Sequence, residues 1–147
     1  MKPPLLPTVS PKDPADVCPP CGRCCRYVAL GIDAPSSVKA VSMALWFVYH
    51  RDVSIYQSHE GDWFLLVPTE CDNLLPDGLC GVYEHRPFIC REYDVDGCEG
   101  TRDEPAEKLR FDDGPSFVTW LASARPALYA RCVTASVIPK ALWPPRG

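Results

Sequence analysis

Four of the nine cysteines in this sequence fall within eight positions, as Cys18, Cys21, Cys24 and Cys25. Two residues between thiols allow one turn of backbone to direct successive sulfurs toward a common point, about 2.3 Å from a metal ion. The same C-x2-C-x2-C spacing holds iron-sulfur clusters in bacterial ferredoxins, where a further cysteine comes from elsewhere in the chain. The cluster therefore predicts a site for zinc or iron, and its spacing leaves the choice between them open.

Cys24 and Cys25 are adjacent, which raises a separate question about their roles. Neighbouring side chains in extended backbone project to opposite sides of the chain. We therefore expect the two thiols seldom to bind one ion together, so that one of them serves a second site.

Four later cysteines form a second group, with loop-sized intervals that can return the chain to one place: Cys71, Cys80, Cys90 and Cys98. Eight thiols could complete two tetrahedral sites, or four could hold one metal while the others stay free. Cys132 lies outside both groups at the end of an expected helix, and we expect it to be packed as a small apolar side chain.

Histidine nitrogen is the main alternative ligand, because three cysteines and one histidine also form a standard zinc site. Of the three histidines, only His85 lies near the cysteines in sequence, whereas His50 and His59 do not. With eight thiols present, we expect all three histidines to be surface or packing residues.

Two sequence blocks resemble a known family of bacterial cysteine-cluster proteins, the YkgJ-like zinc- or iron-chelating domain. The first block, CPPCGRCC, is similar to the family signature, and the second, CDNLLPDGLCGVYEHRPFICREY, is similar to its later block. In the second block the motif positions are Cys71, Cys80, Tyr83, Arg86, Pro87, Cys90 and Arg91. The chain departs from the pattern at Cys98, since six residues separate it from Arg91 where the family usually has fewer.

The resemblance implies metal chelation and leaves open whether the protein catalyses a reaction. We expect an iron-sulfur cluster or iron as the cofactor, with zinc as the alternative. The competing hypothesis is an iron-sulfur redox or methyl-transfer enzyme, or a subunit of one, similar to the flagellin lysine methylases that use S-adenosylmethionine. The absence of a glycine-rich nucleotide fingerprint argues against methyl transfer.

Arg86 and Arg91 lie within the second cysteine block and are candidate cofactor-binding residues. A guanidinium group could donate hydrogen bonds to thiolate sulfur and offset the negative charge of a site built from thiolates. The simpler interpretation is a salt bridge at the surface.

The remaining pattern predicts a small α+β domain, in which a β-hairpin and two helices pack beside an irregular, metal-bound half. Apolar residues at spacings of three and four predict a helix over 36–51, and VSIYQ and DWFLLVP predict a hairpin. Residues 70–100 lack a sustained hydrophobic period and are expected to be irregular. Residues 103–114 are expected to form an acidic linker. A closing helix that contains Trp120 and Leu128 is expected to be interrupted near Pro126. We expect a proline-rich arm at 1–16, the domain at 17–138 and a tail at 139–147.

Composition excludes several classes of partner. The formal charge is −4 and there is no basic stripe, which argues against nucleic acid. The longest apolar run, 43–49, is far shorter than the roughly 20 residues that cross a membrane. The N-terminus lacks the apolar segment of a secretory signal, so we expect a cytoplasmic protein with thiols kept reduced. A protein partner stays possible and unspecified.

Overall fold

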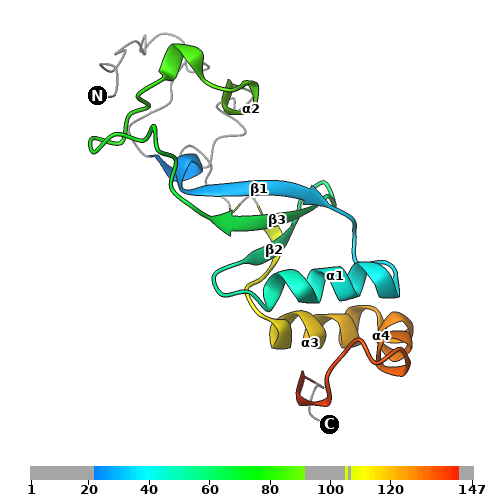
Figure 1. Ribbon diagram of the computed structural model, residues 1–147. Coiled ribbons are helices and arrows are strands. Elements are labelled where there is room, and N and C mark those ends of the chain that lie inside the picture. Colours follow the sequence, from blue (N-terminus) through cyan, green and yellow to red (C-terminus); the bar gives the residue numbers. More distant parts are fainter. Residues whose placement is uncertain (1–21, 92–104, 106, 143–147) are drawn as a thin grey trace. The chain divides into compact units, whose positions relative to one another are not determined.

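The computed structural model describes residues 22–91, 105 and 107–142. Residues of the chain group into two compact units, Met1–Val28 with Thr69–Ala106, and Ala29–Pro68 with Glu107–Gly147. We call the first the cysteine unit and the second the core unit. The architecture is α+β, as the sequence predicts (Figure 1).

One four-stranded sheet has the order β1-β3-β2-β4. The predicted hairpin is confirmed, since β2 (Ser54–Ser58) pairs antiparallel with β3 (Trp63–Pro68), with Leu65 opposite Ile55. Gly61 in the connecting loop has a φ of 98°, a conformation that favours glycine.

Two strands of this sheet were not predicted. The segment expected to be an acidic linker contains β4 (Glu107–Phe111), which pairs antiparallel with β2. The other is β1 (Tyr27–Ile32), which follows the cysteine cluster directly. In β4 the apolar side chains of Leu109 and Phe111 alternate with charged ones, which is the period of a half-buried strand.

Helix α1 (Val38–Val48) confirms the helix predicted over 36–51. The Ser37 hydroxyl caps its first turn by accepting a hydrogen bond from the Ala40 amide at 3.1 Å. The buried stripe of this helix is made of Val41, Ala44, Leu45 and Val48. The spacing of three and four residues between these apolar positions is the pattern from which the helix is predicted.

The predicted interruption near Pro126 is also confirmed. Helix α3 (Gly114–Ala124) begins after Asp113, whose side chain accepts from the Ser116 amide at 2.8 Å, and ends at Arg125. Helix α4 (Pro126–Thr134) then starts at the proline. Proline disfavours helical backbone in the residue before it, and Arg125 accordingly has φ −138°.

The apolar core of the described residues lies entirely in the core unit. Helices α1, α3 and α4 pack on one another beneath the sheet (Figure 1), and the aromatic rings of Trp63, Phe111, Phe117 and Trp120 cluster between helix and strand. Cys132 on α4 is completely buried in this core, which confirms its expected packing role. No helix in the described part of the chain is long and apolar enough to span a membrane.

The burial of Cys132 predicts a specific order of stabilities among its variants. Cys132→Ser places a hydroxyl without an evident partner in the core, which we expect to lower the free energy of unfolding by about 1–3 kcal/mol. Cys132→Ala removes more volume but adds no polar group, and should cost about 1 kcal/mol. Denaturant unfolding of both variants measures the difference. A serine variant as stable as the wild type would contradict this placement.

Candidate metal centre

The two cysteine blocks are joined by main-chain hydrogen bonds in the cysteine unit. The Cys71 amide donates to the Cys25 carbonyl at 2.7 Å, and the Thr69 amide donates to the Arg26 carbonyl at 3.0 Å. Arg26 and Glu70 add an ion pair at 2.7 Å, in which both side chains are mostly exposed. The chain around Cys25 is therefore held alongside the chain around Cys71, although 46 positions separate them.

The first cluster turns sharply at Gly22, a residue that the sequence analysis did not single out. Its φ is 60°, and a side-chain Cβ at this position would lie 2.8 Å from Cδ1 of Leu74. Glycine therefore satisfies both the backbone conformation and the close approach of Leu74. Its position directly after a cysteine in CPPCGRCC is the sequence feature that indicates a turn here.

Cys24 and Cys25 lie in a 3₁₀ helix, Arg23–Arg26, and not in extended backbone as expected. The Cys25 amide donates to the Gly22 carbonyl at 3.2 Å, which closes this turn. Burial raises the pKa of Cys25, and a side-chain hydrogen bond that joins the two neighbouring thiols partly offsets this rise. The expectation that these two thiols seldom bind one ion together assumed extended backbone, which this segment does not have, and whether both are ligands stays a prediction.

A short loop brings Cys71 and Cys80 back toward each other. Leu74 and Cys80 form an antiparallel bridge, and the Gly81 amide donates to the Asn73 carbonyl at 2.7 Å. The Asn73 amide also lies 3.4 Å from Sγ of Cys71, which accepts its hydrogen bond. Amide hydrogen bonds to sulfur are among the interactions that tune thiolate metal centres.

Cys90 lies in a short helix, α2 (Phe88–Arg91). The side chain of Arg91 stabilises the turn that precedes this helix. The Arg91 guanidinium donates through Nε to the Arg86 carbonyl at 2.9 Å and through Nη2 to the Glu84 carbonyl at 2.8 Å. The Cys90 amide donates to the Pro87 carbonyl at 3.0 Å. Arg91 thus holds the backbone before Cys90 in place.

Arg86 is bound in a similar way and also acts on a thiol by its charge. Its Nε donates to the Tyr83 carbonyl at 2.9 Å, and its guanidinium carbon lies 3.9 Å from the centre of the Tyr83 ring. The positive charge of Arg86 opposes the rise in the pKa of Cys90 that burial and the thiols of Cys71 and Cys80 cause. A direct bond from either arginine to thiolate sulfur stays a prediction.

The described thiols are close enough to influence each other's ionisation. Burial raises the pKa of Cys25 most, and the neighbouring charges of Cys71, Cys80 and Cys90 raise it further. Grouped thiolates repel one another, and a bound cation removes that cost. The donor set therefore fits a thiolate-binding ion such as Zn²⁺ or iron.

The eight predicted ligands are only partly within the described residues. Cys18, Cys21 and Cys98 lie outside them, whereas Cys24, Cys25, Cys71, Cys80 and Cys90 belong to the cysteine unit and form no disulfide bond with one another. Within the described residues no three His, Cys, Asp or Glu side chains converge closely enough to hold a metal ion. The complete ligand set remains a prediction.

The histidines are dispersed in the structure. His85 is an exposed residue of the cysteine unit, on the 3₁₀ turn Tyr83–His85. His50 and His59 belong to the core unit, where Nδ1 of His50 lies 2.7 Å from the Trp46 carbonyl.

Comparison with known proteins assigns this arrangement to a family. A family model named CxxCxxCC and described as a "putative zinc- or iron-chelating domain" matches residues 17–112. The chain belongs to this family. The match covers both cysteine blocks as far as Cys98 and extends through β1 to β4, and it supports metal binding. No curated protein and no solved structure matched the chain.

The bonds of Arg91 predict that it positions Cys90. Lysine keeps the charge but lacks the planar fork that reaches two carbonyls, so Arg91→Lys should weaken metal binding about tenfold. Arg26→Lys, which alters an exposed ion pair in the same unit, is the matched control and should change affinity less than about twofold. Competition with a chromophoric chelator measures both variants. Equal effects would contradict a special role for Arg91.

Proposed function

We propose that this protein binds iron, held as an iron-sulfur cluster, through thiolates of both cysteine blocks. The main support is the pairing of the Cys71 amide with the Cys25 carbonyl, since it holds the first block next to the second. The Leu74–Cys80 bridge and the bonds of Arg91 hold the local backbone of Cys80 and Cys90, two residues of the same unit. We choose the iron-sulfur cluster because bacterial ferredoxins hold such clusters with the same C-x2-C-x2-C spacing, a spacing that by itself also suits zinc.

The proposed ligands are Cys18, Cys21, Cys24, Cys25, Cys71, Cys80, Cys90 and Cys98. Bound metal would supply positive charge at grouped thiolates, and the residues of the chain would hold the sulfurs in place. Gly22 permits the turn between the first thiols, and the Asn73 amide donates to Sγ of Cys71. Arg86 offsets negative charge near Cys90.

The proposed metal site also contributes to the stability of the cysteine unit. All the buried apolar residues of the described core belong to the core unit, whereas Phe88 and Ile89 in the cysteine unit are 79% and 61% exposed. Segments with so little apolar burial gain little from the hydrophobic effect. Metal binding free energy then acts as folding free energy for this unit.

Elemental analysis of protein purified without oxygen tests the proposal. We expect iron with acid-labile sulfide and broad visible absorption. Zinc in a colourless protein would contradict the iron-sulfur assignment and leave thiolate chelation standing. Protein that takes up neither metal during anaerobic reconstitution would contradict chelation itself.

Two cysteine variants connect the metal content to the proposed ligands. Cys71→Ser removes an exposed thiol of the cysteine unit and should lose most of the metal, whereas Cys132→Ala in the buried core should retain it. The same elemental analysis measures both. Equal metal loss in the two variants would contradict the assignment of Cys71.

A further inference from the structure

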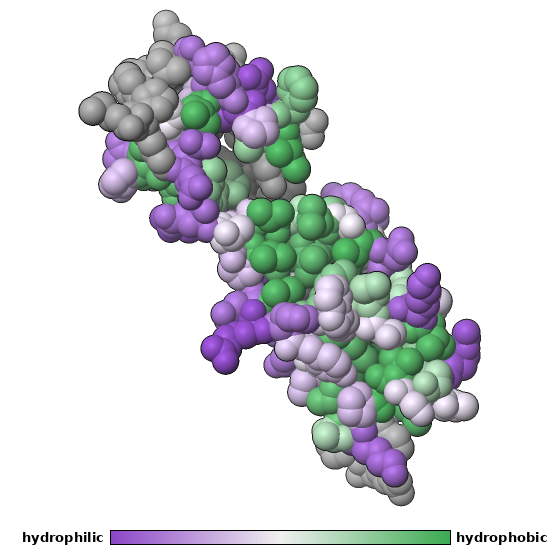
Figure 2. All heavy atoms as spheres, in the orientation of Figure 1, coloured by the Kyte–Doolittle hydropathy of each residue, from purple (hydrophilic) through white to green (hydrophobic). Residues whose placement is uncertain are grey.

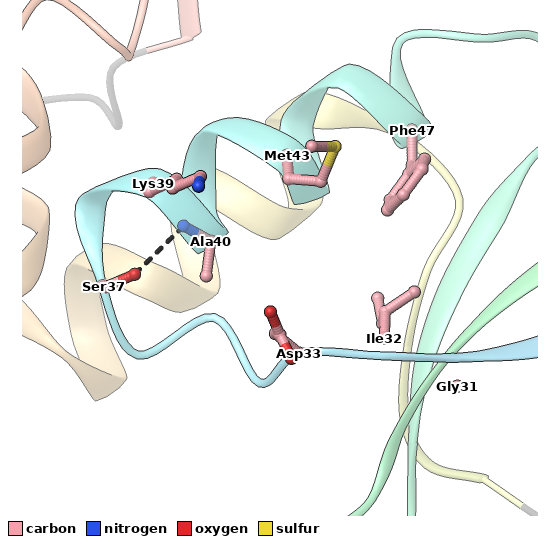
Figure 3. Close-up of a pocket in the computed structure, with 8 residues that line it drawn as sticks. All are labelled: Gly31, Ile32, Asp33, Ser37, Lys39, Ala40, Met43 and Phe47. Atoms are coloured by element: carbon pink, nitrogen blue, oxygen red, sulfur yellow. Dashed lines mark hydrogen bonds between the residues drawn. The ribbon is translucent and has the colours of Figure 1, made fainter.

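A hollow in the core unit lies between the end of β1 and helix α1, on residues that the metal site does not use. Its volume is about 380 Å³, and Figure 3 shows the side chains around it. The lining comes from Gly31, Ile32, Asp33, Ser37, Lys39, Ala40, Met43 and Phe47.

The two ends of this hollow differ in chemistry. Ser37 and Lys39 lie at one end, Ile32 and Phe47 lie at the other, and Asp33 lies between the two ends (Figure 3). Lys39, Met43 and Phe47 follow at intervals of four along α1, so they share one face of the helix. The hollow therefore has a cation at one end, a carboxylate near its middle and an apolar surface at the other end.

The charges of Asp33 and Lys39 are not paired with each other. In the ranges that the structure covers, neither Asp33 nor Lys39 forms an ion pair or a side-chain hydrogen bond, so their charged atoms are more than 4.0 Å apart. Unpaired surface charges are ordinary, because an exposed pair gains only about 0–1 kcal/mol. What distinguishes these two is that they border one hollow, beside apolar side chains.

We propose that this hollow binds a free apolar α-amino acid. Such a molecule carries a carboxylate and an ammonium on one carbon, followed by an apolar side chain, which matches the order of Lys39, Asp33 and Phe47 along the hollow. Its ammonium would lie against Asp33, its carboxylate against Lys39, and its side chain against Met43 and Phe47. Met43 contributes apolar surface to the hollow and is 47% exposed. A ligand bound there would therefore remove apolar surface from water.

Titration of the full chain with L-leucine, followed by amide NMR spectra, tests the proposal. Leucine is preferred to methionine as the probe because it has no thioether that could bind metal. We expect saturable shifts at Gly31, Lys39 and Phe47, with a dissociation constant of about 1 mM. Glycine chelates metal through the same groups but lacks the apolar part, and should bind much more weakly. The absence of saturable shifts at these residues, or equal binding of glycine, would overturn the proposal.

Leucine analogues that lack one charge test whether Asp33 binds the ammonium and Lys39 binds the carboxylate. We expect 4-methylpentanoate, without the ammonium, and 3-methylbutylamine, without the carboxylate, each to bind about fivefold more weakly than leucine. Asp33→Asn should abolish the preference for leucine over 4-methylpentanoate. Lys39→Gln should abolish the preference for leucine over 3-methylbutylamine.

Matched controls remove the same charges elsewhere in the core unit. Asp62→Asn and Lys108→Gln alter exposed residues away from the hollow and should leave both preferences intact. Preferences that survive in Asp33→Asn and Lys39→Gln, or that the control variants lose equally, would overturn the assignment. The test measures binding of leucine and its analogues and does not depend on the iron or zinc content of the protein. Its outcome is therefore independent of the proposed metal site.

Discussion

The hydrogen bond from the Cys71 amide to the Cys25 carbonyl is the constraint on which the cysteine unit depends. It joins two segments that are distant in sequence, and each segment brings its own thiols. Gly22 allows the first segment to turn against Leu74, and Leu74 is bridged to Cys80. A substitution that separates these two segments would therefore move the thiols apart even if every cysteine were kept.

The two units are stabilised by different physical means. In the core unit, helices and sheet bury a continuous apolar cluster, to which Cys132 contributes as an apolar residue. Figure 2 shows one outer face of the protein, on which further apolar side chains are drawn in green. The described part of the cysteine unit has main-chain hydrogen bonds, an exposed ion pair and arginine contacts to carbonyls instead. Such contacts individually add little net stability in water. The proposed thiolate–metal bonds would add the stability that these contacts of the described residues do not supply.

The elements with strong periodic or turn signals could be predicted from the sequence, and those without them could not. The stripe of α1, Gly61 in the hairpin and Pro126 between two helices each act through local backbone chemistry. Strand β4 was mistaken for a linker because its acidic surroundings masked the alternation of Leu109 and Phe111 with charged residues. The cysteine spacing predicts which segments would contribute ligands, and that assignment stays a prediction. The 3₁₀ turn at Cys24 and Cys25 is accompanied by contacts between segments that spacing does not encode.

The claim that metal takes the place of an apolar core in the cysteine unit is tested most directly by amide hydrogen exchange, residue by residue, with metal bound and after removal by a chelator. The account predicts that metal loss strongly accelerates exchange at Cys71, Leu74 and Gly81, which donate the hydrogen bonds of the cysteine unit. Exchange at Leu45 and Leu121 in the core unit should change little, because apolar burial protects these amides. Unchanged protection of Cys71, Leu74 and Gly81 after confirmed loss of metal would contradict the account.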